Sequence, residues 1–140
     1  MPDSVVKYEA SYDKENNILF CKFIGSPKSN YDAEFIANKN LEWYLKGGDT
    51  KVWQIIDTSE MGMAHPRYVN RFSELDAPNT KKYVIDYCTV CSNMLERIAA
   101  KLYDTLSGNP RPIFPTVEKA VEWILKQQKK HGKTEPINNY

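Results

Sequence analysis

The feature that most constrains the fold is the stretch from residue 81 to 107, where a short apolar run leads into a long amphipathic pattern. Between residues 83 and 88, apolar side chains fall on both alternating faces, which is typical of a central strand covered by a layer on each side. After residue 93, apolar side chains recur every three or four positions, which predicts a helix with one wide apolar face. These helical positions are Met94, Leu95, Ile98, Ala99, Leu102, Tyr103 and Leu106.

The junction between this strand and this helix lies at residues 88–93. Ser92 is expected to cap the helix, because its hydroxyl can accept a hydrogen bond from an amide of the first turn. Gly108, followed by Pro110, is expected to end it. In open α/β sheets the carboxyl ends of strands and the amino ends of helices face one crevice, so a ligand is expected to bind at this junction.

Composition limits the class of protein. The 140 residues are 41% hydrophobic and 26% charged, which fits one folded domain, expected over residues 1–132 with a loose tail at 133–140. No run approaches the ~20 apolar residues of a membrane-spanning helix, and the first ten residues lack the pattern of a signal peptide, so no membrane insertion is expected and the expected compartment is the cytoplasm. A net charge of +1 gives no reason to expect nucleic-acid binding. Three cysteines in such a chain predict free thiols.

The rest of the chain alternates strands with helices. Period-two patterns predict an antiparallel hairpin near the N-terminus, and Pro, Gly and Asn residues mark the ends of later elements. The expected order is strands at 6–12 and 18–24, helix 30–45, strand 51–57, helix 66–75, strand 83–88, helix 94–106, a very short edge strand at 113–114 and helix 117–131. The predicted fold class is therefore α/β, with a mostly parallel sheet of four to five strands, an N-terminal antiparallel hairpin and four helices.

Two segments of the chain resemble a known family. Residues 51–61, KVWQIIDTSEM, are similar to the third strand of STAS-like domains and to its exit, in which Asp and Ser alternate before an apolar residue. Residues 111–125, RPIFPTVEKAVEWIL, are similar to the short aromatic strand and last helix of the SpoIIAA-like group of small stand-alone proteins. The order of elements over nearly the whole chain also resembles this fold, which is named for sulfate transporters and anti-sigma factor antagonists.

The resemblance implies a binding or regulatory module and not an enzyme. Anti-sigma factor antagonists carry a switch serine at the start of the second helix, but the corresponding residues here, His65-Pro66-Arg67-Tyr68, include no serine. A phosphorylation switch is therefore not expected. The similarity to CRAL-TRIO lipid-binding proteins implies a small or lipid-like ligand. A protein partner, including a second copy of the chain in a homodimer, is the other expectation.

Polar residues near two strand ends form the predicted ligand site. One group follows the predicted strand at 51–57, and the other follows the strand at 83–88. If the two strands are neighbours, their carboxyl ends meet, and these groups can hydrogen-bond a ligand. The alternative is that Asp57 and Ser59 only cap loop amides, as Asx and Ser turns do. The six candidate ligand-binding residues are Asp57, Ser59, His65, Cys91, Ser92 and Asn93.

The motif Cys88-Thr89-Val90-Cys91 supports two other hypotheses. A thiol near a helix N-terminus has a lowered pKa, so a thiol–disulfide oxidoreductase is the alternative function, although the Trp and Pro of thioredoxin-like motifs are absent. A zinc site would have to recruit Cys21 or one of the two histidines, and no metal or other cofactor is expected. No hydrolase, phosphate-loop or dinucleotide-binding motif occurs, so no catalytic residue is assigned.

The three hypotheses predict different structures. A ligand carrier requires a cavity lined by Met61, Met63, Tyr68 and Phe72. A thiol enzyme requires an exposed Cys91. A protein-interaction module requires neither, but it presents an apolar patch on a helix face.

Overall fold

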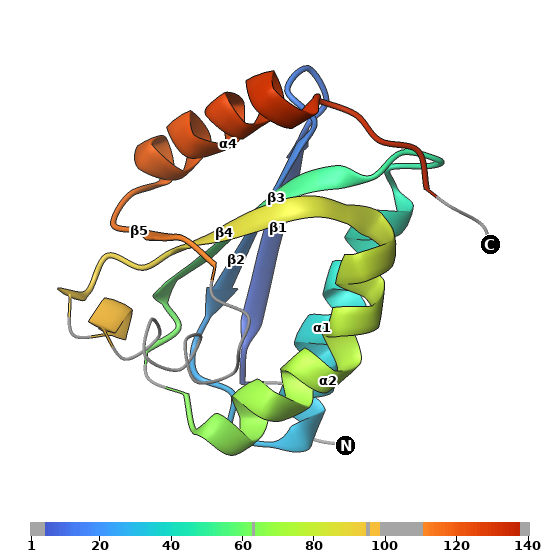
Figure 1. The fold of residues 1–140 in the computed structure, drawn as a ribbon. Coiled ribbons are helices and arrows are strands. Elements are labelled where there is room, and N and C mark those ends of the chain that lie inside the picture. The colour runs from blue at the N-terminus through green and yellow to red at the C-terminus, as the bar shows by residue number, and fades with distance from the viewer. Residues whose placement is uncertain (1–4, 63, 95, 99–110, 138–140) are drawn as a thin grey trace.

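Five strands form one sheet in the order β1-β2-β3-β4-β5 (Figure 1). The computed structural model describes residues 5–62, 64–94, 96–98 and 111–137. β1 pairs antiparallel with β2, and the later pairs are all parallel, which confirms the predicted hairpin and mostly parallel sheet. The strands are β1 (Lys7–Asp13), β2 (Ile18–Ile24), β3 (Val52–Glu60), β4 (Val84–Val90) and β5 (Ile113–Phe114).

Helices cover both faces of the sheet. α1 (Asn30–Leu45) and α2 (Pro66–Tyr83) lie on one face, and α4 (Val117–His131) lies on the other (Figure 1). The predicted helix over 94–106 lies mostly outside the described residues, although residues 94 and 96–98 are helical. No helix in the described ranges has both the length and the apolar character needed to cross a bilayer.

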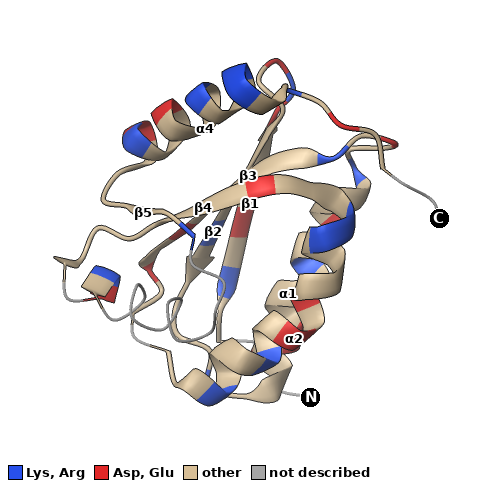
Figure 2. Ribbon diagram, in the orientation of Figure 1, with Lys and Arg blue, Asp and Glu red and all other residues tan. Residues whose placement is uncertain are grey.

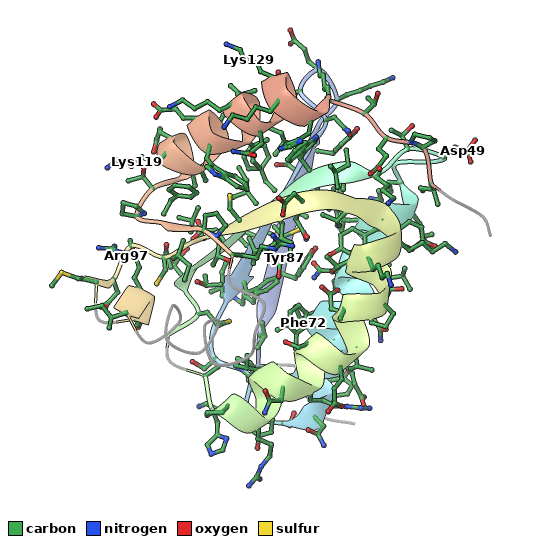
Figure 3. All side chains as sticks on the ribbon, in the orientation of Figure 1. Asp49, Phe72, Tyr87, Arg97, Lys119 and Lys129 are labelled. Atoms are coloured by element: carbon green, nitrogen blue, oxygen red, sulfur yellow. The ribbon has the colours of Figure 1, made fainter. Side chains whose placement is uncertain are left out.

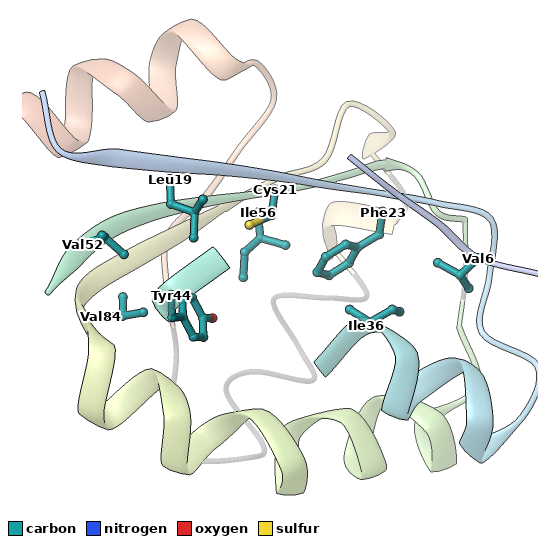
Figure 4. Packing of buried hydrophobic residues seen from close by; sticks show 9 residues of the cluster. All are labelled: Val6, Leu19, Cys21, Phe23, Ile36, Tyr44, Val52, Ile56 and Val84. Atoms are coloured by element: carbon teal, nitrogen blue, oxygen red, sulfur yellow. The ribbon is translucent and has the colours of Figure 1, made fainter. Parts of the chain in front are cut away.

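Each face of the sheet has its own hydrophobic core. Side chains of β2 and β3 that point toward α1 and α2 form the first core, and Figure 4 shows nine of its residues, including Cys21, Phe23, Ile36 and Ile56. The opposite face packs against α4. Its fully buried members are Ile18, Trp53, Ile55, Cys88, Val90, Ala120 and Ile124.

Three elements extend further than the sequence predicts. β3 continues from residue 57 to Glu60, because Ile24 pairs with Glu60 and the amide of Gly25 donates to the Glu60 carbonyl at 2.9 Å. β4 ends at Val90, two residues after the predicted end. α2 runs through Pro78 to Tyr83, although residues 77–79 are predicted to end it. Pro78 and Glu74 are exposed, so the Glu74 carbonyl that Pro78 leaves unbonded can be hydrated.

Residues 133–137, which follow α4, are held in place by hydrogen bonds. The amide of Lys51 donates to the Glu135 carbonyl at 2.8 Å, and the amide of Ile137 donates to the Asp49 carbonyl at 2.9 Å. The Trp53 indole Nε1 donates to the Lys133 carbonyl at 3.2 Å. These bonds attach residues 133–137 to the start of β3, which corrects the expectation of a free tail for this part of the chain.

Candidate functional site

A cavity lies along the inner side of α2, beside the few α2 side chains, such as Phe72 and Tyr83, that pack against the first core. All 18 residues of α2 are described, and Asp76 is the one that is buried. The cavity has a volume of about 860 Å³ and lies between α2 and the sheet face that carries the first core. Figure 3 labels Phe72 on α2 and Tyr87 on β4, and both line this space. The apolar part of the wall is made by Phe23, Ile36, Ile56, Met61, Val69 and Phe72.

The cavity fits the prediction made for a ligand carrier. Three of the four expected wall residues, Met61, Tyr68 and Phe72, line it, while Met63 lies outside the described residues. The Phe72 ring packs edge-on against Phe23, with centroids 5.9 Å apart. The wall is thus built from apolar side chains of α1, α2, β2 and β3, which suits an apolar ligand.

One part of the cavity wall is polar and centres on Asp76. Its carboxyl group is almost fully buried, with 6% of the residue exposed. Thr80 Oγ1 donates to Oδ2 at 2.9 Å, and Asn40 Nδ2 donates to Oδ1 at 3.3 Å. The Tyr44 hydroxyl lies 3.5 Å from Oδ2. All three of these groups are neutral, and burial raises the pKa of Asp76 despite their hydrogen bonds.

The contacts of Asp76 continue into a closed ring of six side chains. The Tyr44 hydroxyl donates to Gln54 Oε1 at 3.1 Å, and Gln54 Nε2 lies 3.4 Å from Cys21 Sγ. The Tyr8 hydroxyl lies 3.1 Å from the same sulfur and 2.6 Å from Asn40 Oδ1. Asn40 returns to Asp76. The ring joins β1, β2, β3, α1 and α2 behind the cavity wall.

Burial favours the uncharged forms of the titratable side chains in the ring. It raises the pKa of the Cys21 thiol to about 11 and the pKa values of Tyr8 and Tyr44 above the ordinary tyrosine value. A charge on any of these groups would be poorly solvated, because each is surrounded by protein. Burial therefore raises the pKa of every titratable acid in the ring, Asp76 included.

The structure brings some of the six predicted residues together and separates others, since Ser59 contacts Ser92 whereas Asp57 and Cys91 line different hollows. Asp57 to Glu60 belong to β3, so their side chains alternate between the two faces of the sheet. Asp57 lines a smaller hollow of about 320 Å³ beside Glu9, Lys22 and Val117, on the α4 side. Cys91 instead lines the cavity beneath α2. The predicted strand ends at Asp57, whereas β3 continues to Glu60, so residues 58–60 belong to the sheet.

Ser59, Ser92 and Asn93 bind main-chain groups. Ser59 Oγ accepts from the Ser92 amide at 3.1 Å, and Asp57 Oδ1 accepts from the Ser59 amide at 2.9 Å. Asn93 Oδ1 accepts from the Glu96 amide at 3.0 Å, so Asn93 is the helix cap that the sequence assigned to Ser92. These contacts agree with the alternative in which the polar residues cap amides.

His65 caps α2. Its Nδ1 accepts from the Arg67 amide at 3.1 Å, and Pro66 occupies the first helical position, as predicted. The His65 side chain is exposed at the surface. Its neighbours Ala64, Pro66 and Tyr68 line the cavity. In this structure His65 therefore positions α2 at the edge of the cavity.

The thiols do not have the environment that an oxidoreductase needs. Cys88 and Cys91 are free and buried, with 0% and 3% of each residue exposed. Burial raises the pKa of Cys88 to about 12, and burial also raises that of Cys91. The Cys91 thiol lies 3.7 Å from Glu96 Oε2, which disfavours a thiolate. Among the described residues, no three His, Cys, Asp or Glu side chains are grouped so as to hold a metal ion.

Sequence reasoning missed Asp76, Gln54 and Asn40. A signal for Asp76 was present, because Phe72, Asp76 and Thr80 follow one another at four-residue spacing and therefore share a helix face. A carboxyl on the apolar face of a helix predicts either a buried polar network or a ligand contact. Gln54 has a similar signal, since it interrupts the apolar run of β3.

Comparison with known proteins agrees with this architecture. No protein-family model and no curated protein matches the sequence. Among solved structures, an uncharacterized DUF3478-family protein with a SpoIIAA-like fold from Shewanella loihica PV-4 is similar with a TM-score of 0.61 and 15% identity, over 89% of this chain and 97% of that chain. An anti-sigma factor antagonist from Mycobacterium paratuberculosis is similar with a TM-score of 0.57 and 11% identity, over 85% of this chain and 95% of that chain. The chain therefore has the SpoIIAA-like fold that its sequence resembles.

Proposed function

We propose that this protein is a non-catalytic binding module that holds a small or lipid-like ligand in the cavity between α2 and the sheet. The proposal rests on how little the apolar side chains of α2 are buried. Val69 and Phe72 on its inner side line the cavity and remain only half-buried, although Phe72 also packs against Phe23. The cavity volume of about 860 Å³ lies within the range of about 300–1,000 Å³ that is typical of ligand pockets.

The chemistry of the wall favours an amphipathic ligand. Apolar side chains make most of the wall, so an alkyl chain or ring system would gain about 25 cal/mol for each Å² of apolar surface removed from water. Asp76, Gln54 and Thr80 add a polar area at one place along α2. A ligand with an apolar body and one polar group would match both regions.

The test is binding of a fluorescent long-chain probe to wild-type protein and to two tryptophan variants. Val69→Trp places a larger side chain in the cavity and is expected to weaken probe binding at least about tenfold by filling the space. Leu75→Trp is the matched control, because Leu75 lies on α2 and does not line the cavity. Equal binding by both variants would contradict the proposal, as would a wild type that binds no probe.

A protein partner is the second candidate function. Met94 and Ile98 lie one helical turn apart and are 62% and 59% exposed, which is unusual for large apolar side chains. A partner or a second copy of the chain would cover them. Light scattering after chromatography tests the homodimer, and the double variant Met94→Lys with Ile98→Lys is expected to convert a dimer to a monomer. If the wild type is monomeric at all concentrations, a second copy of the chain does not cover this surface, and the partner would have to be a different protein.

A further inference from the structure

We infer that the cavity selects an amphipathic ligand that carries a primary ammonium group, and that Asp76 binds this group. The inference rests on the proposed function, because it names the ligand class of the same cavity. Asp76 is the one acidic residue of the cavity wall that α2 buries, and its contacts leave room for a further donor.

The hydrogen bonds that Asp76 already accepts show where its carboxylate has room for another donor. A carboxylate has about four acceptor positions, two on each oxygen. Thr80 donates to Oδ2 and Asn40 donates to Oδ1, whereas Tyr44 lies 3.5 Å from Oδ2 and donates its one proton to the nearer Gln54 oxygen. One acceptor position on Oδ1 therefore remains for a group in the cavity. An ammonium group, which has three donors and no acceptor, matches this vacancy.

The charges along the cavity favour a cation over an anion. Lys51 is paired with Glu135 at 3.5 Å, and Arg111 is paired with Asp86 at 3.4 Å, so these two cations are already compensated. The donors to Asp76 are neutral, so its carboxylate lacks a positive partner. Figure 2 shows basic residues in the last turn of α2, where Lys81 also lines the cavity. The lining residues include four acids, Asp76, Asp86, Glu96 and Glu135, against three bases, Lys51, Lys81 and Arg111, so acidic groups are in the majority. A ligand ammonium would supply the missing positive charge.

The ring also explains how the buried Asp76 carboxyl group is hydrogen-bonded when the cavity holds no ligand. Tyr44 has one hydroxyl proton, which it donates to the nearer Gln54 oxygen. A protonated Asp76 can then donate from Oδ2 to the Tyr44 oxygen, so the ring closes with each group donating once. An ammonium ligand favours the ionised form of Asp76, and any proton that the carboxyl group releases passes to the buffer. No covalent bond forms or breaks in the ligand.

The test compares three probes with the same chain length, dodecylamine, dodecanol and dodecanoic acid, by isothermal titration at pH 7 below their aggregation concentrations. In the wild type we expect the amine to bind at least about tenfold tighter than the alcohol, since a charge-assisted hydrogen bond is roughly twice as strong as a neutral one. Asp76→Asn should remove this preference and leave alcohol binding nearly unchanged. Glu74→Gln, which removes a charge from the exposed side of α2, should retain it.

The outcomes separate the two proposals. If all three probes bind with equal affinity, or if the acid binds best, the cavity binds ligands but the ammonium inference is wrong. If none binds, the proposed function fails and the inference fails with it. If Asp76→Asn does not fold, the wild type alone provides a second test. The ¹³C chemical shift of the Asp76 carboxyl should move to its ionised value when the amine binds and not when the alcohol binds. An unchanged shift with bound amine would overturn the inference.

Discussion

The two faces of the sheet are built differently. On the α4 face, Trp53 and Ile55 are 1% exposed and pack directly against Ala120 and Ile124. On the other face, α2 buries a single carboxylic acid and leaves its apolar side chains over a cavity. Both helices have amphipathic sequences, so the pattern of apolar residues does not distinguish them. Both faces therefore carry a hydrophobic core, and the α2 side additionally leaves apolar surface over a cavity.

The largest expected difference between the faces is the reactivity of two cysteines that lie three residues apart. Cys88 is packed on the α4 face, whereas Cys91 lines the cavity. Iodoacetamide should therefore modify Cys91 about 10³-fold or more faster than Cys88, which needs a large opening of the structure to react. Because burial raises its pKa, Cys91 should still react more slowly than a model thiol. Peptide mass spectrometry gives both rates.

Two outcomes of that experiment would change the interpretation. Equal protection of both cysteines would mean that the cavity is closed to small molecules. Reaction of Cys91 faster than a model thiol would restore the oxidoreductase hypothesis. Dodecylamine should slow the modification of Cys91 and leave Cys88 unchanged, which provides an internal control.

Aromatic truncations should show the next largest difference. Trp53→Ala is expected to lower the free energy of unfolding by about 3–5 kcal/mol, because it leaves a void in a closely packed core. Phe72→Ala should lower it by about 1 kcal/mol, since part of the Phe72 surface already faces open space. Urea unfolding measures both values. Equal losses would show that the α2 face is packed as tightly as the α4 face.

The hydrogen-bonded ring should contribute a smaller amount. Asn40→Ala removes the acceptor of the Tyr8 hydroxyl and the donor to Asp76, so we expect a loss of about 1–3 kcal/mol in the free energy of unfolding. Asn38→Ala on the exposed side of α1 is the matched control, with an expected effect within about 0.5 kcal/mol. Similar losses in the two variants would mean that the ring contributes little to stability.

Much of the fold was predictable because it depends on local periodicity. The hairpin and the short edge strand follow from alternation and from the prolines around Ile113-Phe114. The end of β3 was not predictable, because Asp57 to Glu60 are polar and only pairing with β2 makes them a strand. That extension places Ser59 in the sheet, where its hydroxyl accepts a hydrogen bond from the Ser92 amide after β4.

The candidate site depends on tertiary contacts that periodicity does not report. Met61, Tyr68 and Phe72 were expected to line a cavity, and they do. Asp76 lies just beyond the helix predicted over residues 66–75, and its partners Asn40 and Tyr44 come from α1. Sequence separations of more than 30 residues between these partners explain why no local motif predicted the ring.

The smallest predicted effect is the pH dependence that Asp76 imparts to the cavity face. Burial raises the pKa of Asp76 in the folded state above the ordinary value of 3.8. As pH rises above about 3.8, the unfolded chain therefore releases this proton before the folded protein does, and stability falls until the folded pKa is passed. The difference in unfolding free energy between wild type and Asp76→Asn, measured in urea across this range, should decline with rising pH. Parallel curves would contradict this prediction, whereas a rising difference would show that Asp76 is stabilised as a carboxylate in the empty protein. An amine ligand should abolish the decline, because it stabilises the ionised carboxylate in the folded state alone.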